Sequence, residues 1–151
     1  EKKIKLLQLL ENIKDPVRKM DLLITAKNFV CPSLFMAEEL KKKGGKTWVY
    51  QFNRVRDNGL AKKYGAFHGA ELPYVFNTHD EWLPTNETDI KLTGEIQSYW
   101  LSFAKTGNPN NNDAALWPEY DSSDDSTLVL DDEIYQRSHE SSEICKEMEL
   151  F

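Results

Sequence analysis

The histidine at position 68 lies in a stretch whose residue types suit proton-transfer chemistry, Gly65-Ala66-Phe67-His68-Gly69-Ala70-Glu71. Histidine exchanges a proton near neutral pH, and small neighbours let its ring stand clear of the backbone. An isolated histidine of this kind is nevertheless more often a partly buried residue of an ordinary loop. Two interpretations also fit Glu71: a group that hydrogen-bonds near His68, or the ordinary carboxylate of a helix start.

The other reactive side chains do not complete a catalytic site. A general base needs a nucleophile to activate and a group that orients its ring, but the sequence contains no Gly-x-Ser-x-Gly motif. Cys31 is a poor nucleophile candidate because it lies at an apolar helix junction without a basic partner nearby in sequence. His68, His79 and His139 lack metal-ligand spacing, so no metal site is predicted. The last two lie in polar segments and are predicted to be surface residues.

Three helices and one strand are predicted ahead of the histidine. Apolar periodicity predicts helices over residues 1–13, 17–30 and 33–43, with breaks at Asp15-Pro16 and Cys31-Pro32 and an end at Gly44-Gly45. Residues 46–52 are aromatic and β-branched and form the strongest strand candidate. A polar excursion over residues 53–63 then leads to His68. This places the histidine on the loop after a strand, where α/β folds carry their sites.

The elements after the histidine are mostly helical. Residues 71–76 predict a helical turn or two, and residues 88–105 predict a long helix whose aromatic stripe is core packing. A short strand over residues 127–130 is predicted at a sheet edge, and a charged helix that carries Cys145 is predicted over residues 141–151. With no repeats and no linker, the sequence predicts one unit.

Composition excludes several classes of protein. The 151 residues are 40% hydrophobic and 29% charged, which is typical of one soluble, globular domain. The net charge of −6, with acidic and basic residues interspersed, argues against a nucleic-acid partner. No run of the sequence approaches the apolar length needed to cross a bilayer. The chain opens without a methionine or a signal peptide, which suggests a fragment or a processed chain.

Two weak signals point outside the cytosol. Cys31 and Cys145 are far apart in sequence, so two free thiols are the default interpretation and a bridge the alternative. Asn86-Glu87-Thr88 is an N-glycosylation acceptor, which is usable only in a secretory compartment.

Five segments, in order, resemble the C-terminal part of type-B carboxylesterases, the group that includes the cholinesterases. They are Asn28-Phe29-Val30-Cys31-Pro32, Trp48-Val49-Tyr50-Gln51-Phe52, residues 65–76, residues 99–110 and Leu116-Trp117-Pro118-Glu119-Tyr120. The resemblance runs from about Val17 to the end of the chain. Five motifs in the expected order make it highly specific.

The resemblance implies an α/β fold, in which residues 1–151 are the C-terminal portion of one α/β-hydrolase domain, with helices packed on the end of a mostly parallel sheet. It implies hydrolysis of small-molecule or lipid esters by a Ser–Glu/Asp–His triad in that chain order. His68 matches the triad histidine, the general acid and base, and Glu71 matches a carboxylate close to the triad. The serine and the acid are then expected upstream, the chain alone is expected to be inactive, and no cofactor is implied.

The resemblance also bears on the cysteines. Cys31 and Cys145 match a disulfide pair of the cholinesterase branch, which agrees with the Asn86 acceptor and with a secreted or lumenal location. One departure is Ala26, where members of the family often have an aspartate, and this puts a local ion pair in doubt.

Two alternatives accompany this interpretation. A catalytically silent, cholinesterase-like adhesion or binding protein would keep the fold and could keep His68. An autonomous small domain is disfavoured, because the predicted strands are too few to complete a sheet. The helix over residues 88–105 and the C-terminal helix are candidates for a homo-oligomer interface.

Overall fold

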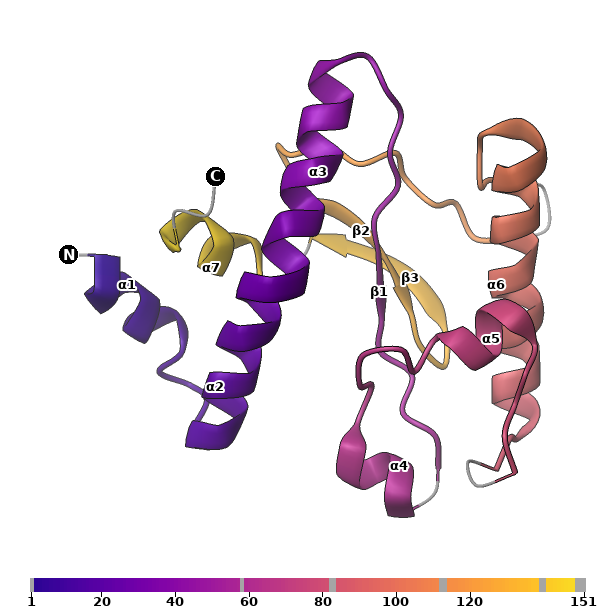
Figure 1. The fold of residues 1–151 in the computed structure, drawn as a ribbon, viewed down its shortest axis with the longest axis horizontal. Helices are drawn as coiled ribbons and strands as arrows, with labels where there is room; N and C mark the ends of the chain where they lie inside the picture. Colours follow the sequence, from indigo (N-terminus) through magenta and orange to yellow (C-terminus); the bar gives the residue numbers. More distant parts are fainter. Residues whose placement is uncertain (1, 58, 82–83, 112–113, 139–140, 149–151) are drawn as a thin grey trace. The chain divides into compact units, whose positions relative to one another are not determined.

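The structure is a computed structural model that describes residues 2–57, 59–81, 84–111, 114–138 and 141–148 (Figure 1). It separates into two compact units. The helical unit comprises Glu1–Val49, Glu119–Ser126 and Ser138–Phe151, and the sheet unit comprises Tyr50–Pro118 and Thr127–Arg137.

The main element of the helical unit is one continuous helical run. It consists of α2 (Pro16–Thr25), the π-helical segment η1 (Ala26–Val30) and α3 (Cys31–Lys42). The predicted break at Cys31-Pro32 is therefore wrong. Pro32 has no backbone N–H to donate, and the helix accommodates it through the wider π turn, while the hydroxyl of Ser33 donates to the carbonyl oxygen of Phe29 at 2.7 Å.

Because this run is unbroken, the expectation that no segment reaches membrane-spanning length also needs correction. By length and composition alone, Pro16–Lys42 is long and apolar enough to cross a bilayer. Core helices of soluble proteins meet the same criterion, and this one contributes Cys31, Leu34 and Ala37 to a packed core. The run is weak evidence for a membrane span.

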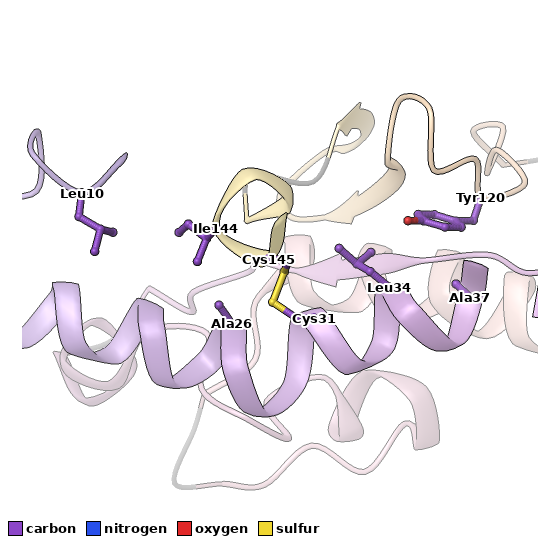
Figure 2. Close-up of a cluster of buried hydrophobic side chains, with 8 residues drawn as sticks. All are labelled: Leu10, Ala26, Cys31, Leu34, Ala37, Tyr120, Ile144 and Cys145. Carbon is purple, nitrogen blue, oxygen red and sulfur yellow. A yellow bond between two sulfur atoms is a disulfide. The ribbon is translucent and has the colours of Figure 1, made fainter. Parts of the chain in front are cut away.

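A hydrophobic cluster holds the helical unit together (Figure 2). It unites buried side chains from four separate parts of the chain: Leu10, Ala26, Cys31, Leu34, Ala37, Tyr120, Ile144 and Cys145. Ala26 is fully buried there, so the position at which the family often carries an aspartate is an apolar core position in this chain. Helices α1 (Lys2–Leu9) and α7 (Ser142–Glu147) pack against each other at one side of the unit (Figure 1).

The strand before the histidine is shorter than predicted. Of the predicted residues 46–52, only Tyr50–Phe52 form a strand, β1. The preceding residues bond to the helical unit instead: the carbonyl oxygen of Thr47 accepts from the backbone N–H of Tyr120 at 2.8 Å. Residues 46–49 have strand-forming side chains, but their backbone runs as extended chain and does not pair with another strand.

Over the described residues, the sheet has three strands in the order β1-β2-β3, where β2 is Ser126–Leu130 and β3 is Ile134–Ser138. β1 and β2 pair in parallel, with Tyr50 opposite Leu128 and Phe52 opposite Leu130. The predicted edge position of β2 is wrong, because β3, which the sequence analysis missed, covers its other side. Thr127 and the three residues after it are fully buried, as expected of a central strand.

In the part of the chain between β1 and β2 that the structure describes, the sheet unit has three helices. They are α4 (Gly59–Tyr64), which the sequence analysis took for a polar loop, α5 (Leu72–Phe76) and α6 (Glu87–Thr106). Asn86 caps α6 in a reciprocal capping box with Asp89, and Gly107 ends it in the left-handed conformation. α5 packs directly against α6 (Figure 1). The predicted positions of α5 and α6 are confirmed.

Candidate active site

His68 lies at the corner of a tight turn between α4 and α5. The prediction of a loop directly after the strand is therefore wrong, because α4 separates His68 from β1. The N–H of Ala70 donates to the carbonyl oxygen of Phe67 at 2.9 Å, and Gly69 has a φ of +88°. A positive φ at the third residue of a hydrogen-bonded turn is the signature of type II, and it is the reason glycine follows the histidine. His68 occupies the second position, and its side chain is exposed.

Both flanks of this turn are anchored by backbone hydrogen bonds. Gly65, at a φ of +66°, ends α4, and its N–H donates to the carbonyl oxygen of Ala61 at 2.7 Å. On the other side, the N–H of Leu72 donates to Gly69 at 3.1 Å, so that the turn passes straight into α5. The two glycines that drew attention in the sequence thus shape the backbone on each side of His68.

Aromatic side chains accompany the histidine. Phe67 and Tyr64 are both exposed and meet edge to face, with ring centroids 6.5 Å apart. They present an apolar surface beside a side chain that can exchange protons.

Glu71 occupies the N-cap position of α5, without a side-chain hydrogen bond to the helix. Its side chain is half-buried. Burial raises the pKa of Tyr50 on β1, and the negative charge of Glu71 raises it further. Glu71 therefore acts electrostatically on the strand that precedes the site.

A buried polar network reaches α5 through Tyr74 and is centred on Asp89 of α6. Its Oδ1 atom accepts from the hydroxyl of Tyr74 at 2.7 Å and from Nε of Arg54 at 2.9 Å, and its Oδ2 atom accepts from the N–H of Asn86 at 3.0 Å. Burial alone would raise the pKa of Asp89, but these three donors outweigh it and lower the pKa. Asp89 is therefore held as a carboxylate.

His79 belongs to the same region and is not the surface residue predicted from its polar neighbours. Its Nδ1 atom lies 2.7 Å from Nη2 of Arg56, and its Nε2 atom lies 2.8 Å from Oγ1 of Thr93. Because a guanidinium only donates, Nδ1 is the acceptor and Nε2 carries the proton. Burial and then the charge of Arg56 lower the pKa of His79.

The sequence analysis did not predict this network, although the sequence contains one signal for part of it. Asn86 and Asp89 stand three residues apart ahead of an apolar helix, which is the spacing of a capping box. That pattern could have fixed the start of α6. Nothing in the sequence indicated that Arg54, Tyr74 and His79 would converge on the same helix end.

The remaining predicted residues lie elsewhere. Cys31 and Cys145 form a disulfide, with Cα atoms 5.4 Å apart, so neither is a free thiol. This is the pairing that the resemblance implies (Figure 2). Asn86 is exposed, and its Nδ2 atom donates to Asp57 at 2.6 Å while its Oδ1 atom caps α6. His139 lies outside the described residues.

No metal site emerges within the described part of the chain, where no group of three or more His, Cys, Asp or Glu side chains could hold an ion. A hollow of about 500 Å³ lies in the helical unit, lined mainly by apolar residues of α3 such as Pro32, Phe35 and Met36. None of the residues singled out for chemistry lines it.

Comparison with solved structures identifies the fold class of this chain. Two solved structures, of a thermophilic PNB esterase and of a PNB esterase, superpose with TM-scores of 0.77 and 0.76 at 27% and 28% identity. In both cases the match covers 95% of this chain and 30% of the other. The fold is therefore α/β, a portion of the α/β-hydrolase fold.

Sequence comparison narrows this class to a family. The model described as "Carboxylesterase family" matches residues 7–147. The para-nitrobenzyl esterase of Bacillus subtilis is 38% identical over 109 residues, which are 69% of this chain and 21% of the esterase. Acetylcholinesterase 1 of Caenorhabditis elegans is 32% identical over 117 residues, 72% of this chain and 19% of that enzyme. The chain belongs to the carboxylesterase family and spans about a fifth of the length of these relatives.

Proposed function

We propose that this chain is the C-terminal part of a serine carboxylesterase and supplies the histidine of its catalytic triad, His68. The observation that carries the proposal is the position of His68: an exposed imidazole on a glycine-shaped turn between α4 and α5, in a chain of the carboxylesterase family. Relatives named esterases and acetylcholinesterases support ester hydrolysis as the reaction.

In the proposed reaction, His68 moves protons at two stages. It takes the hydroxyl proton of the serine as the serine oxygen attacks the ester carbonyl carbon, and it gives a proton to the departing alcohol. In the second stage it takes a proton from water, which attacks the acyl-enzyme, and returns that proton to the serine as the acid leaves. An exposed ring on a defined turn suits this role, because the ring must meet both serine and water.

The proposal places the other triad members outside this chain. The chain has no Gly-x-Ser-x-Gly motif, and in the triad order Ser–Glu/Asp–His the histidine comes last. The serine, the acid and the oxyanion donors then come from upstream residues of the same polypeptide, and residues 1–151 alone are inactive. Glu71 is proposed as a carboxylate that supports the site from α5, without touching substrate.

The substrates proposed are small-molecule or lipid esters. The exposed aromatic pair Tyr64 and Phe67 supports an apolar group on the ester near His68. The disulfide and the Asn86-Glu87-Thr88 acceptor support a secreted or lumenal location, since disulfides persist in oxidising compartments.

A fluorophosphonate probe, which labels activated serines, tests the proposal. The polypeptide extended upstream to include a Gly-x-Ser-x-Gly motif is expected to be labelled, whereas residues 1–151 alone are expected to stay unlabelled. Replacing the motif serine by alanine is the control and should abolish labelling. An extended polypeptide that has no such motif, or that resists the probe when folded, would instead support the silent adhesion or binding protein.

A further inference from the structure

The His68 turn is joined to α5 by consecutive backbone hydrogen bonds. The N–H of Leu72 bonds back to Gly69, and the N–H groups of Tyr74 and Val75 bond to the carbonyl oxygen of Glu71. The chain from the turn to Tyr74 is therefore one hydrogen-bonded piece. Any displacement of α5 moves the backbone that carries His68.

Tyr74 anchors α5 in the sheet unit. It is fully buried, although it carries a hydroxyl. Its ring lies 5.1 Å from the ring of Phe52 on β1 and 5.2 Å from that of His79, and the Arg56 guanidinium lies 5.1 Å from its centre. Its hydroxyl donates to Asp89 of α6 at 2.7 Å. One side chain thus ties α5 to the sheet and to the long helix.

The acceptor of this hydrogen bond is itself immobilised. Asp89 is fully buried at the first turn of α6, and Arg54 and the N–H of Asn86 hold its two oxygen atoms. The Arg54 guanidinium is anchored further by Asp132 at 2.6 Å. Because all these donors are in place, Asp89 offers Tyr74 a fixed point.

We infer that Asp89 is a positioning residue which acts through the Tyr74 hydroxyl to hold the His68 turn in register for proton transfer. This inference rests on the proposed function of His68. Neither Tyr74 nor Asp89 touches substrate. Both determine where the imidazole stands relative to a serine supplied from upstream, and a misplacement of about 1 Å in such a group can reduce turnover on the order of a hundredfold.

Tyr74→Phe in the extended, active polypeptide tests the inference, because it removes one oxygen atom and keeps the ring. Two matched controls remove other buried hydroxyls that do not reach the His68 turn. Tyr99→Phe removes a hydroxyl that donates to the carbonyl oxygen of Ala115 at 2.6 Å, and Tyr120→Phe removes one that donates to the carboxylate of Asp125 at 3.0 Å.

Tyr74→Phe is expected to lower kcat on the order of tenfold, with KM within about twofold of the parent. Both controls are expected to keep kcat within about twofold of the parent. Assays are run at a temperature at which circular dichroism shows all three variants folded. A kcat for Tyr74→Phe equal to that of the controls would overturn the inference.

Hydrogen exchange provides the readout that is independent of activity. Tyr74→Phe should speed exchange of the Ala70 and Leu72 amides, whose hydrogen bonds close the turn, and the controls should not. Unchanged exchange at these amides would refute the positioning role even if esterase activity is present. If Tyr74→Phe speeds exchange of these amides but the extended polypeptide hydrolyses no ester, the proposed function is refuted. The structural link between Tyr74 and the His68 turn would then still stand.

Discussion

Nε of Arg54 donates a hydrogen bond to Oδ1 of Asp89 at 2.9 Å, and the two side chains are 3% and 0% exposed. Asp89→Ala would leave the guanidinium buried beside an empty site, with Asp57 and Asp132 as partial compensation. Removing one partner of a buried ion pair costs about 3–5 kcal/mol. We expect a loss of that order in the free energy of unfolding, measured by urea denaturation.

Glu95→Ala is the matched control on the same helix. Its ion pair with Lys91, at 4.0 Å, is largely solvated and is worth less than about 0.5 kcal/mol. Equal losses in the two variants would show that the Asp89 network does not stabilise the sheet unit.

The lowered pKa of His79 predicts that its contacts with Arg56 and Thr93 stabilise the fold less at acidic pH. Both states carry neutral histidine well above about pH 6.5, so this residue contributes no pH dependence there. Below that value the unfolded state takes up the proton first, because burial and the charge of Arg56 oppose protonation of His79 in the folded state. The negative charges of Asp89 and Asp80 favour protonation, but they offset this effect only in part. Stability should therefore fall as the pH drops from about 7.5 to about 5.5.

His79→Gln isolates this contribution. A glutamine can accept from Arg56 and donate to Thr93, as the neutral imidazole does, but it does not titrate. The difference in urea midpoint between the two pH values should shrink in the variant. An unchanged difference would mean that His79 titrates alike in the folded and unfolded states.

The bridge between Cys31 and Cys145 closes a loop of 114 residues in sequence separation. In the loop-entropy model such a closure stabilises the fold by about 5 kcal/mol. The double variant Cys31→Ala/Cys145→Ala is expected to melt well below the parent in calorimetry. Alkylation of the unreduced protein should find neither cysteine free, and two reactive thiols would contradict the pairing.

Asn86 has a structural role that is separable from glycosylation. Asn86→Ala removes the N-cap of α6 and should cost on the order of 1 kcal/mol of stability. Thr88→Ala keeps the cap but destroys the acceptor tripeptide, so it should abolish any glycan without that cost. Both variants are expressed through a secretory pathway and compared by glycosidase-sensitive mobility and by urea unfolding. A mobility shift that survives Thr88→Ala would place the glycan elsewhere.

Local signals predicted α5 and α6 well, but they missed α4 and placed a false break at Cys31-Pro32. Asn86, Gly107 and the apolar stripe between them determine α6 within the segment itself, and Leu72 to Phe76 likewise form α5 as predicted. The edge prediction for β2 failed because β3, a mostly polar strand that begins only four residues after β2 ends, was not recognised as a strand. The pairing of β1 with β2 joins residues almost 80 positions apart, which no local pattern encodes. Pro32 misled because the π turn over Ala26–Val30 lets the helix continue past a residue without an N–H donor, a solution that a residue pattern does not reveal.

In the candidate site, too, the features set by local sequence were visible in the sequence and the long-range contacts were not. Gly65 and Gly69 are visible in the sequence as small neighbours of His68, and the positive φ angles that they adopt are local properties of the backbone. The network of Arg54, Tyr74 and Asp89 spans 35 residues of sequence between its first and last member, and no local pattern encodes such a meeting. The capping spacing of Asn86 and Asp89 locates the start of α6 but none of the partners of Asp89.

The most direct test of the central claim is the turnover of a short-chain p-nitrophenyl ester by His68→Gln in the extended polypeptide. Glutamine keeps the size and polarity of the side chain but cannot shuttle a proton. His139→Gln, in a polar segment, is the control and should keep the parent rate. We expect His68→Gln to lower kcat by a factor on the order of 10⁴ or more while the protein stays folded. Near-normal turnover in His68→Gln would contradict the assignment of His68 as the triad histidine.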